Sequence, residues 1–152
     1  MVTKGKTVAV SGGFDPIHVG HVRMIQEAAK FGSVIVILNS DSWLENKKGY
    51  KFMSWRERSE IISCIKGVER VVAVVDKDET VCQTLRNLKS EVDLTYFANG
   101  GDRKLTNTPE MKVCDQIGVE LLWNVGGEKI QSSSQLVSDA RTGKRLVGGY
   151  WL

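Results

Sequence analysis

The segment "TVAVSGGFDPIHVGH" (residues 7–21) carries the signals that decide the fold of this chain. Its first four residues are apolar or β-branched without alternation, a pattern typical of a strand that is covered on both faces. Residues 11–13, a serine and two glycines, permit a tight turn and a close approach of the backbone to a ligand. The Asp-Pro pair at residues 15 and 16 is a common signal for the start of a helix. The segment therefore predicts a strand, a glycine turn and a helix, in that order.

Strand and helix patterns alternate along the rest of the chain. Further apolar runs rich in β-branched residues lie at 33–38, 68–75, 93–98 and 119–125. Helical patterns lie at 19–31, 54–67, 79–89, 108–117 and 132–141. In the second of these, Ser54 is the expected N-cap and Gly67 the expected end. The alternation predicts an α/β fold, a Rossmann-like three-layer sandwich whose five-stranded, mostly parallel sheet carries helices on both faces. Ligands of such sheets bind beyond the carboxyl ends of the strands.

Length and composition favour one domain. The 152 residues, of which 41% are apolar, are enough for a single core, so we expect one domain over 1–152. The net charge of +3 is the small difference between 21 basic and 18 acidic residues. It argues against a nucleic-acid-binding arm or a membrane-surface peptide, so we expect neither nucleic acid nor a membrane as a partner. The segment 141–152 is basic, then glycine-containing and aromatic, and is either a flexible end or an interface patch.

Sequence features also favour a cytoplasmic location. The N-terminus lacks the long apolar region and cleavage site of a signal peptide, and no apolar run is long enough to span a membrane. Cys64, Cys82 and Cys114 are widely spaced and form no C-x-x-C pair. We therefore expect reduced, buried thiols rather than disulfides or a catalytic cysteine.

His18 and His21 are the only histidines of the chain, and they lie three residues apart at the start of the predicted helix. One interpretation is structural, as part of the helix start. A zinc site would need further ligands, but the chain offers no other histidine and no paired cysteines. In the third interpretation, which we favour, both imidazoles donate hydrogen bonds to a phosphoryl group at a helix N-terminus. Gly20 between them leaves room for that ligand.

The stretch "GGFDPIHVGH" (12–21) resembles the H-x-G-H signature of the cytidylyltransferase-like nucleotidyltransferase superfamily. Three further elements follow in the order that this superfamily has. They are a lysine-bearing loop (47–48) followed by an arginine in "WRERSEII" (55–62), the element "ANGGDR" (98–103), and the serine run "QSSSQLV" (131–137). The match spans roughly residues 7–137 and is specific at the superfamily level. It is nearest to the glycerol-3-phosphate cytidylyltransferase and heptose-phosphate adenylyltransferase branches.

The resemblance implies roles for individual residues. His18, His21, Lys47 and Arg58 would be catalytic. The histidines would contact the triphosphate and stabilise the transition state at the α-phosphorus, and Arg58 would form a charge-assisted fork with a phosphate. The nucleotide-binding residues would be Gly12, Gly13, Phe14, Gly20, Gly101, Asp102, Ser132, Ser133 and Ser134. Asp15 and Lys48 would contact the acceptor substrate or a metal. Mg²⁺ would be held through the substrate phosphates rather than by a protein cage.

The resemblance also implies a reaction. Such an enzyme transfers CMP or AMP from CTP or ATP to a phosphorylated polyol, sugar or amino-alcohol and releases pyrophosphate. The attacking phosphate is ionised at pH 7, so catalysis rests on positioning and charge stabilisation and needs no general base. Relatives are often homodimers, so we expect a homodimer here.

Two alternatives stay open. The first is a catalytically altered nucleotide-binding protein with a regulatory or scaffold role, because Gly127, Lys129 and Val137 depart from the superfamily pattern. The same departures leave the choice between CTP and ATP open. The second is a Rossmann-type dinucleotide binder, which is disfavoured because residues 11–21 lack the G-x-G-x-x-G spacing.

Overall fold

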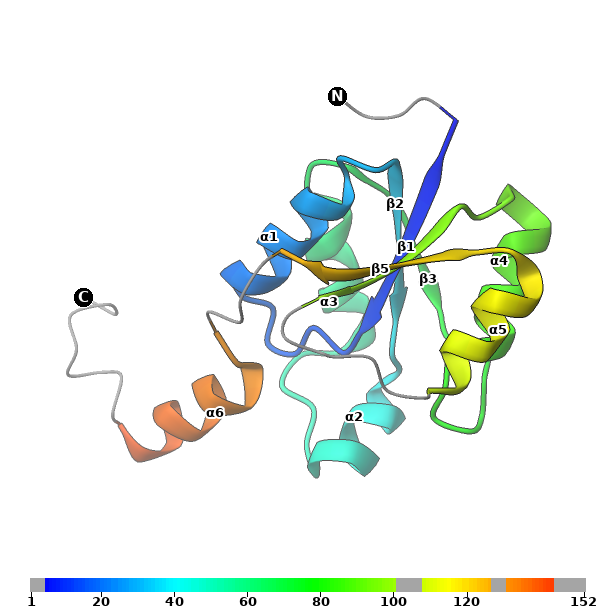
Figure 1. Cartoon of the computed structure of the whole chain (residues 1–152). Coiled ribbons are helices and arrows are strands. Elements are labelled where there is room, and N and C mark those ends of the chain that lie inside the picture. The colour runs from blue at the N-terminus through cyan, green and yellow to red at the C-terminus, as the bar shows by residue number, and fades with distance from the viewer. Residues whose placement is uncertain (1–4, 101–107, 127–130, 144–152) are drawn as a thin grey trace.

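The computed structural model describes residues 5–100, 108–126 and 131–143, and within them it confirms the α/β sandwich (Figure 1). The strands are β1 (Thr7–Gly12), β2 (Ser33–Leu38), β3 (Val68–Ala73), β4 (Tyr96–Gly100) and β5 (Glu120–Val125). The sheet has the order β3-β2-β1-β4-β5, and all its ladders are parallel. The chain therefore runs from β1 outward to β3 and then returns to β4 on the other side of β1. The crevice between the carboxyl ends of β1 and β4 is the topological switch point, where such sheets bind ligands.

The helices are α1 (Val19–Ala28), α2 (Asp41–Lys48), α3 (Trp55–Ser63), α4 (Cys82–Val92), α5 (Pro109–Ile117) and α6 (Ser133–Thr142). Figure 1 shows α1 and α3 on one face of the sheet and α4 and α5 on the other. Each face of the sheet has its own hydrophobic core, and alternate residues of β1 contribute to different cores. Val8 and Val10 face α1 and α3, while Ala9 faces α4 and α5. The helices α2 and α6 lie beyond the carboxyl ends of the strands, on the side to which β1 points.

Most helix starts follow from local chemistry. Ser54 caps α3 by accepting the backbone N–H of Glu57, as expected, and Thr108 caps α5 ahead of a proline at its first turn. The helix α3 ends at Ser63, before the expected Gly67, which instead has a φ of 100° in the turn to β3. An added Cβ at Gly67 would lie 2.7 Å from the Cβ of Ala29, so this turn requires glycine for both reasons.

The structure corrects the expected lysine-bearing loop, because Lys47 and Lys48 form the last turn of α2. Ser40 caps this helix by accepting the N–H of Trp43, and Gly49 ends it with a φ of 83°. The two lysines are favourable at the carboxyl end of the helix dipole. Only Leu44 of α2 is buried, so the helix has almost no apolar stripe to indicate it in the sequence.

The cysteines differ from the expectation in one case. Cys114 is buried and Cys82 is half-buried, whereas Cys64 is exposed at the end of α3. Burial, together with the nearby Cys82 and Glu110, raises the pKa of Cys114 to about 12, so this thiol stays protonated and unreactive. None of the helices in the described ranges is long and apolar enough to cross a membrane.

Candidate functional site

The candidate site lies at the carboxyl ends of β1, β2 and β4, on two sides of the glycine turn that follows β1. On the side of α4 and α5 there is a cavity of about 250 Å³. Its lining comes from the strand ends, from α2 and from the start of α5: Ser11, Gly12, Asn39, Trp43, Lys47, Glu79, Val81, Phe97, Thr108, Glu110, Met111, Leu121 and Trp123. On the side of α1 lie the two histidines. The glycine turn therefore separates an open cavity from a pair of imidazoles.

The two histidines build the start of α1 together. His18 is the N-cap, and its Nδ1 accepts the backbone N–H of Gly20 at 3.0 Å. In return, the Nδ1 of His21 accepts the backbone N–H of His18 at 3.2 Å. The rings stack with their centroids 3.8 Å apart and an interplanar angle of 25°. This is a capping box made of two imidazoles, so the structural and the phosphate-binding interpretations of the pair are not exclusive.

The cap fixes which nitrogen of each ring can donate. A neutral imidazole has one N–H donor and one acceptor nitrogen. Because Nδ1 of both His18 and His21 accepts from the backbone, a neutral ring of either residue carries its proton on Nε2. In the neutral forms, the two N–H donors of the pair are therefore on Nε2, and the capping box does not use them.

The environment of His21 keeps this ring neutral. Burial, followed by the nearby His18 and the charge of Lys48, lowers the pKa of His21 to about 3. Phe14 adds to the burial, since its ring meets that of His21 edge to face at a centroid distance of 4.7 Å. Phe14 itself has a φ of 50°, a left-handed backbone that disfavours side chains, so its surroundings must hold it in place. We assign Phe14 a positioning role for His21.

We expect the ¹⁵N shifts of His21 to stay those of the neutral Nε2–H form from about pH 8 to about pH 5, because its pKa is about 3. The same ring in the urea-unfolded chain should titrate near its ordinary pKa of about 6.5. Since the pKa is lower in the folded state, the stability that this residue contributes is present above about pH 6.5. It falls as the pH drops from there toward 3. A folded-state midpoint near 6.5 would contradict this assignment.

A second helix begins beside the histidines. The hydroxyl of Ser133 donates to the backbone carbonyl of Pro16 at 2.7 Å, which ties the start of α6 to the segment before α1. Ser132 is the N-cap of α6 and accepts the N–H of Gln135, while Ser134 is exposed. Figure 1 shows the beginning of α6 next to that of α1. Two helix N-termini, which both favour anions, therefore lie side by side.

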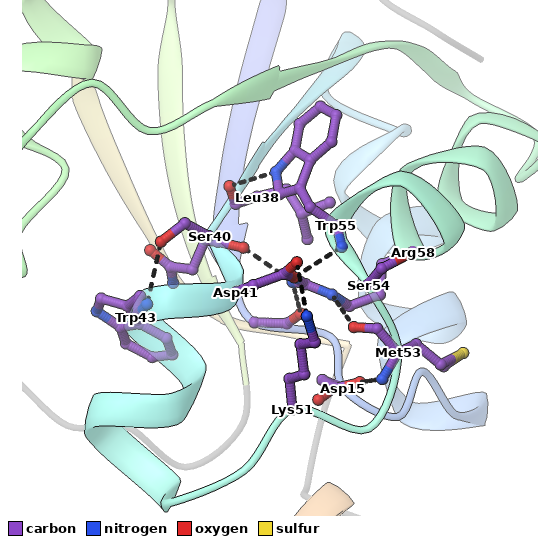
Figure 2. Close-up of polar contacts among 12 residues, drawn as sticks. Asp15, Leu38, Ser40, Asp41, Trp43, Lys51, Met53, Ser54, Trp55 and Arg58 are labelled. Carbon is purple, nitrogen blue, oxygen red and sulfur yellow. Dashed lines mark hydrogen bonds and ion pairs between the residues drawn. The ribbon is translucent and has the colours of Figure 1, made fainter.

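Arg58 does not have the place that the resemblance implied. Its side chain is fully buried, so in this structure it presents no fork to a phosphate. The guanidinium donates instead to the carbonyls of Gly13, Asn39 and Met53 and to a carboxylate oxygen of Asp41 (Figure 2). It thereby joins the glycine turn after β1, the end of β2, the start of α2 and the loop before α3. We assign Arg58 a positioning role for the site.

Asp41 completes this network. Its Oδ1 also accepts the backbone N–H of Trp55 at 2.7 Å, and its Oδ2 lies 3.5 Å from the Nζ of Lys51 (Figure 2). Burial raises the pKa of Asp41, but the hydrogen bonds from Arg58 and Trp55 and the charge of Lys51 outweigh it. The pKa of this carboxyl is therefore lowered from its ordinary value, and the carboxylate is the stable partner of Arg58.

Asp15 also differs from its expected role as a contact for the acceptor or a metal. The residue is fully buried, and its carboxylate oxygens accept the backbone N–H groups of Phe52 and Met53 (Figure 2). Asp15 therefore anchors the loop between α2 and α3 to the turn after β1. That loop also reaches α6, since the Arg141 guanidinium lies 5.2 Å from the centroid of the Tyr50 ring.

The structure separates the two lysines that the sequence placed together. Lys47 lines the cavity on the side of α4 and α5, whereas the charge of Lys48 acts on His21. The expected roles, Lys47 in catalysis and Lys48 at the acceptor or a metal, stay predictions. Lys48 is on the side of the imidazoles, and Lys47 is on the side of the cavity.

The glycine turn is required by packing. An added Cβ at Gly13 would lie 2.8 Å from Cδ2 of the fully buried Leu44 and 3.4 Å from Cζ3 of Trp43. Gly12 lines the cavity and its carbonyl accepts the N–H of Asn39. Backbone and α2 can approach each other this closely only because residue 13 has no side chain.

Some expected residues lie outside the described ranges, and others were missed. Gly101, Asp102, Gly127 and Lys129 lie outside, while Val137 is buried in α6. Asn39, Trp43, Glu79 and Glu110 line the cavity but were not expected there. Asn39 follows directly after the β2 run, so its place at the carboxyl end of a parallel strand was a usable signal. The sequence gives no such signal for Trp43, because the helix α2 that carries it was not predicted.

Within 5–100, 108–126 and 131–143, no cluster of three or more histidine, cysteine or acidic side chains could hold a metal. The oxygens of Asp15 are used by backbone N–H groups. Mg²⁺ commonly binds through substrate phosphates and water, with one or two carboxylates, so a protein cage is not required for it.

Comparison with known proteins places this geometry in a family. A model of the family described as cytidylyltransferase-like matches residues 9–147. Two proteins named bifunctional protein HldE, from Geotalea uraniireducens and Geobacter sulfurreducens, are 32% and 35% identical over 93% and 82% of this chain. These matches cover 28% and 25% of the relatives, so this chain spans about a quarter of their length.

Solved structures share the fold at lower sequence identity. The lipopolysaccharide core biosynthesis protein of Thermoplasma volcanium has a TM-score of 0.61 at 22% identity, covering 78% of this chain and 93% of its own. A protein described as a putative nicotinate-nucleotide adenylyltransferase, from Vibrio parahaemolyticus, has a TM-score of 0.58 at 14% identity, covering 91% and 88%. At these identities the likeness shows the architecture alone.

Proposed function

The chain belongs to the cytidylyltransferase-like nucleotidyltransferases, and from this premise we propose that it transfers CMP or AMP from CTP or ATP to a phosphorylated small molecule. The acceptor is a phosphorylated polyol, sugar or amino-alcohol, and pyrophosphate is released. The observation that carries the proposal is the imidazole capping box beside the start of α6. It gathers two imidazoles and two helix N-termini around one place on the α1 side of the glycine turn.

The bond changes are a displacement at phosphorus. A phosphate oxygen of the acceptor attacks the α-phosphorus, and the bond from that phosphorus to the bridging oxygen of the β-phosphate breaks. Pyrophosphate leaves with the electron pair. The attacking oxygen is already ionised, so the protein positions the reactants and stabilises charge rather than removing a proton.

Each part of the site has a task in this displacement. The Nε2–H groups of His18 and His21 donate to the α-phosphoryl oxygens, whose charge is rearranged in the transition state. The start of α6 and the Ser134 hydroxyl hold the β- and γ-phosphates. Lys48 neutralises charge on the same side, and Lys47 holds the phosphate of the acceptor at the mouth of the cavity. Bound Mg²⁺ would neutralise further charge on the triphosphate.

A matrix of pyrophosphate-release assays tests the proposal. CTP and ATP are each combined with glycerol 3-phosphate, phosphoethanolamine and sugar phosphates of six and seven carbons, in the presence of Mg²⁺. We expect pyrophosphate with one triphosphate and one class of acceptor. Triphosphate binding without turnover on any acceptor would instead support the regulatory or scaffold alternative. Tight binding of NAD in place of a triphosphate would support a dinucleotide binder.

The remaining expectations are parts of the same proposal. Chelation of Mg²⁺ by EDTA should abolish turnover and leave the fold intact, because the ion is held through the substrate. The homodimer is checked by light scattering on the purified chain. The cytoplasmic location is checked by fractionation of the source cells.

A further inference from the structure

Few side chains of α6 are buried. Of residues 133–142, all of which the structure describes, only Ser133, Val137 and Asp139 are buried, and Val137 is the one apolar residue among them. Figure 1 shows the helix outside the layers that cover the sheet. Because hydrophobic stabilisation is proportional to the apolar area buried, one valine contributes little to holding a helix in place. The contacts at the two ends of α6 therefore matter for its position.

These contacts lie on one face of the helix. Ser133, Val137 and Arg141 are spaced by four residues, so their side chains project from the same side of α6. The Ser133 hydroxyl donates to the carbonyl of Pro16 at 2.7 Å. Further along the helix, the Arg141 guanidinium lies 5.2 Å from the centroid of the Tyr50 ring, within the range of a cation–π contact. The residues that make the two contacts are about 12 Å apart along the helix axis.

Both contacts lead back to the turn after β1. Pro16 directly follows Asp15, whose carboxylate accepts the backbone N–H of Phe52. Tyr50 lies between this anchor and Gly49, which ends α2 with a φ of 83°. The Tyr50 ring is thus carried by a short loop that is fixed on both sides, and it gives α6 a well-placed partner.

The same loop adjoins the residues on the α1 side of the glycine turn. Lys48 lies two residues before Tyr50, and its charge acts on His21. The contact between Tyr50 and Arg141 closes a ring that runs from residues 15–16 through the loop to the end of α6, and along α6 back to residues 15–16. Within this ring, the start of α6 keeps its place beside the start of α1 (Figure 1).

We propose that Arg141 and Tyr50 are positioning residues for the triphosphate, because their contact holds α6 with its N-terminus beside the two histidines. This inference rests on the proposed function for the identity of the ligand. Arg141 has a second effect, since its charge is favourable in the last turn of α6 even without a ring beside it. Substitutions of Tyr50 separate the two effects, because they leave that charge in place.

Amide hydrogen exchange of the chain without ligand tests the contact. A ten-residue helix is only marginally stable alone in water, so detachment of α6 exposes its amides to exchange. Tyr50→Leu removes the aromatic face and should raise the exchange rates of residues 137–142 about two- to five-fold, as for the loss of an exposed cation–π contact. Tyr50→Phe keeps the face and should exchange like the wild type. Equal rates in Tyr50→Leu and the wild type would overturn the inference.

Two further variants identify the partners of the contact. Arg141→Met combined with Tyr50→Leu should raise the exchange of α6 no more than Arg141→Met alone, because both substitutions remove the same contact. Additive increases would overturn the inference. Lys6→Met is the matched control, since the Nζ of Lys6 lies 5.6 Å from the centroid of the Tyr96 ring, at the amino ends of the strands. It removes the same kind of contact far from α6 and should leave the exchange of α6 unchanged.

Calorimetric titration with CTP and with ATP in the presence of Mg²⁺, combined with steady-state kinetics, tests the positioning role. We expect Tyr50→Leu to weaken the triphosphate that the wild type binds by about two- to five-fold. The KM for this triphosphate should rise by the same factor, while kcat changes by less than about two-fold, since the contact acts on binding. Wild-type affinity in Tyr50→Leu would overturn the positioning role, as would a lower kcat at unchanged KM.

The two proposals fail separately. If the wild type binds neither triphosphate while Tyr50→Leu still exchanges faster, the contact holds α6, but the transfer reaction and the role in triphosphate binding are rejected. If the wild type and Tyr50→Leu release pyrophosphate with the same KM, the transfer reaction is retained and the positioning role of Arg141 and Tyr50 is rejected.

Discussion

His18→Asn is expected to lower kcat by about 100-fold while leaving the thermal midpoint and the affinity for the triphosphate close to those of the wild type. Asparagine is among the best N-cap residues, so its side-chain oxygen can still accept the N–H of Gly20. It has no donor at the position of the imidazole Nε2. A donor that acts mainly on the transition state contributes about 10²- to 10³-fold to kcat, so the loss falls on turnover. Steady-state kinetics, triphosphate titration and thermal unfolding together give the three values.

His18→Ala is the matched control for this variant. It removes the cap as well as the donor, so it should also lose about 0.5–2 kcal/mol of stability. If His18→Asn kept wild-type kcat, the capping box would be structural only. A second outcome would also contradict the assignment: His18→Asn could keep the wild-type kcat but lose triphosphate affinity and kcat/KM by the same factor. His18 would then contribute to ground-state binding and not to the transition state.

Arg58→Met is expected to lower the free energy of unfolding by about 3–5 kcal/mol. The substitution keeps much of the side-chain volume but leaves the carbonyls of Gly13, Asn39 and Met53 without this donor. Asp41 keeps the N–H of Trp55 and the charge of Lys51, so the cost comes mainly from the unmatched carbonyls, at about 1–3 kcal/mol for each that stays buried. Urea unfolding followed by circular dichroism measures the change.

Arg56→Met provides the comparison, because Arg56 is exposed on the same helix and should change the stability by no more than about 0.5 kcal/mol. Arg58→Lys distinguishes the positioning role from direct phosphate contact. Lysine keeps the charge but cannot span the four acceptors of the guanidinium, so it too should be strongly destabilised. Near-native stability with a large loss of substrate affinity would favour the phosphate contact that the resemblance implied.

The strands and the glycine turn with its two histidines could be predicted from the sequence because both depend on neighbouring residues. Consecutive apolar residues indicated β1 and β2 within a few residues of their observed bounds, since a strand buried on both faces has no polar position. The His18–His21 pair was recognised because its spacing is that of one helical turn. The serine run indicated the start of α6 for the same local reason.

The roles of Asp15 and Arg58 could not be predicted, because they depend on contacts far along the chain. Asp15 accepts N–H groups 37 and 38 residues away, and Arg58 reaches Gly13 across 45 residues. A buried carboxylate bound by backbone N–H groups looks, in the sequence, like any polar residue near a motif. The division between Lys47 and Lys48 was missed because adjacent residues of a helix point in directions about 100° apart, and α2 was expected to be a loop.

The cavity beside α2 depends on these same long-range contacts. Arg58 and Asp15 fix α2 and the following loop against the turn after β1, which places Trp43 beside Gly13. The side chains that line the cavity therefore depend on how α2 is held, and no local motif of the chain reports their arrangement.

The most direct test of the central claim is ³¹P NMR of the complete reaction with ¹⁸O in the phosphate of the acceptor. We predict equal amounts of pyrophosphate and of a nucleoside diphosphate conjugate, with ¹⁸O in the new bridge at the α-phosphorus and none in the pyrophosphate. Pyrophosphate or inorganic phosphate that carries the label, or a bound triphosphate that stays intact with every acceptor, would contradict it.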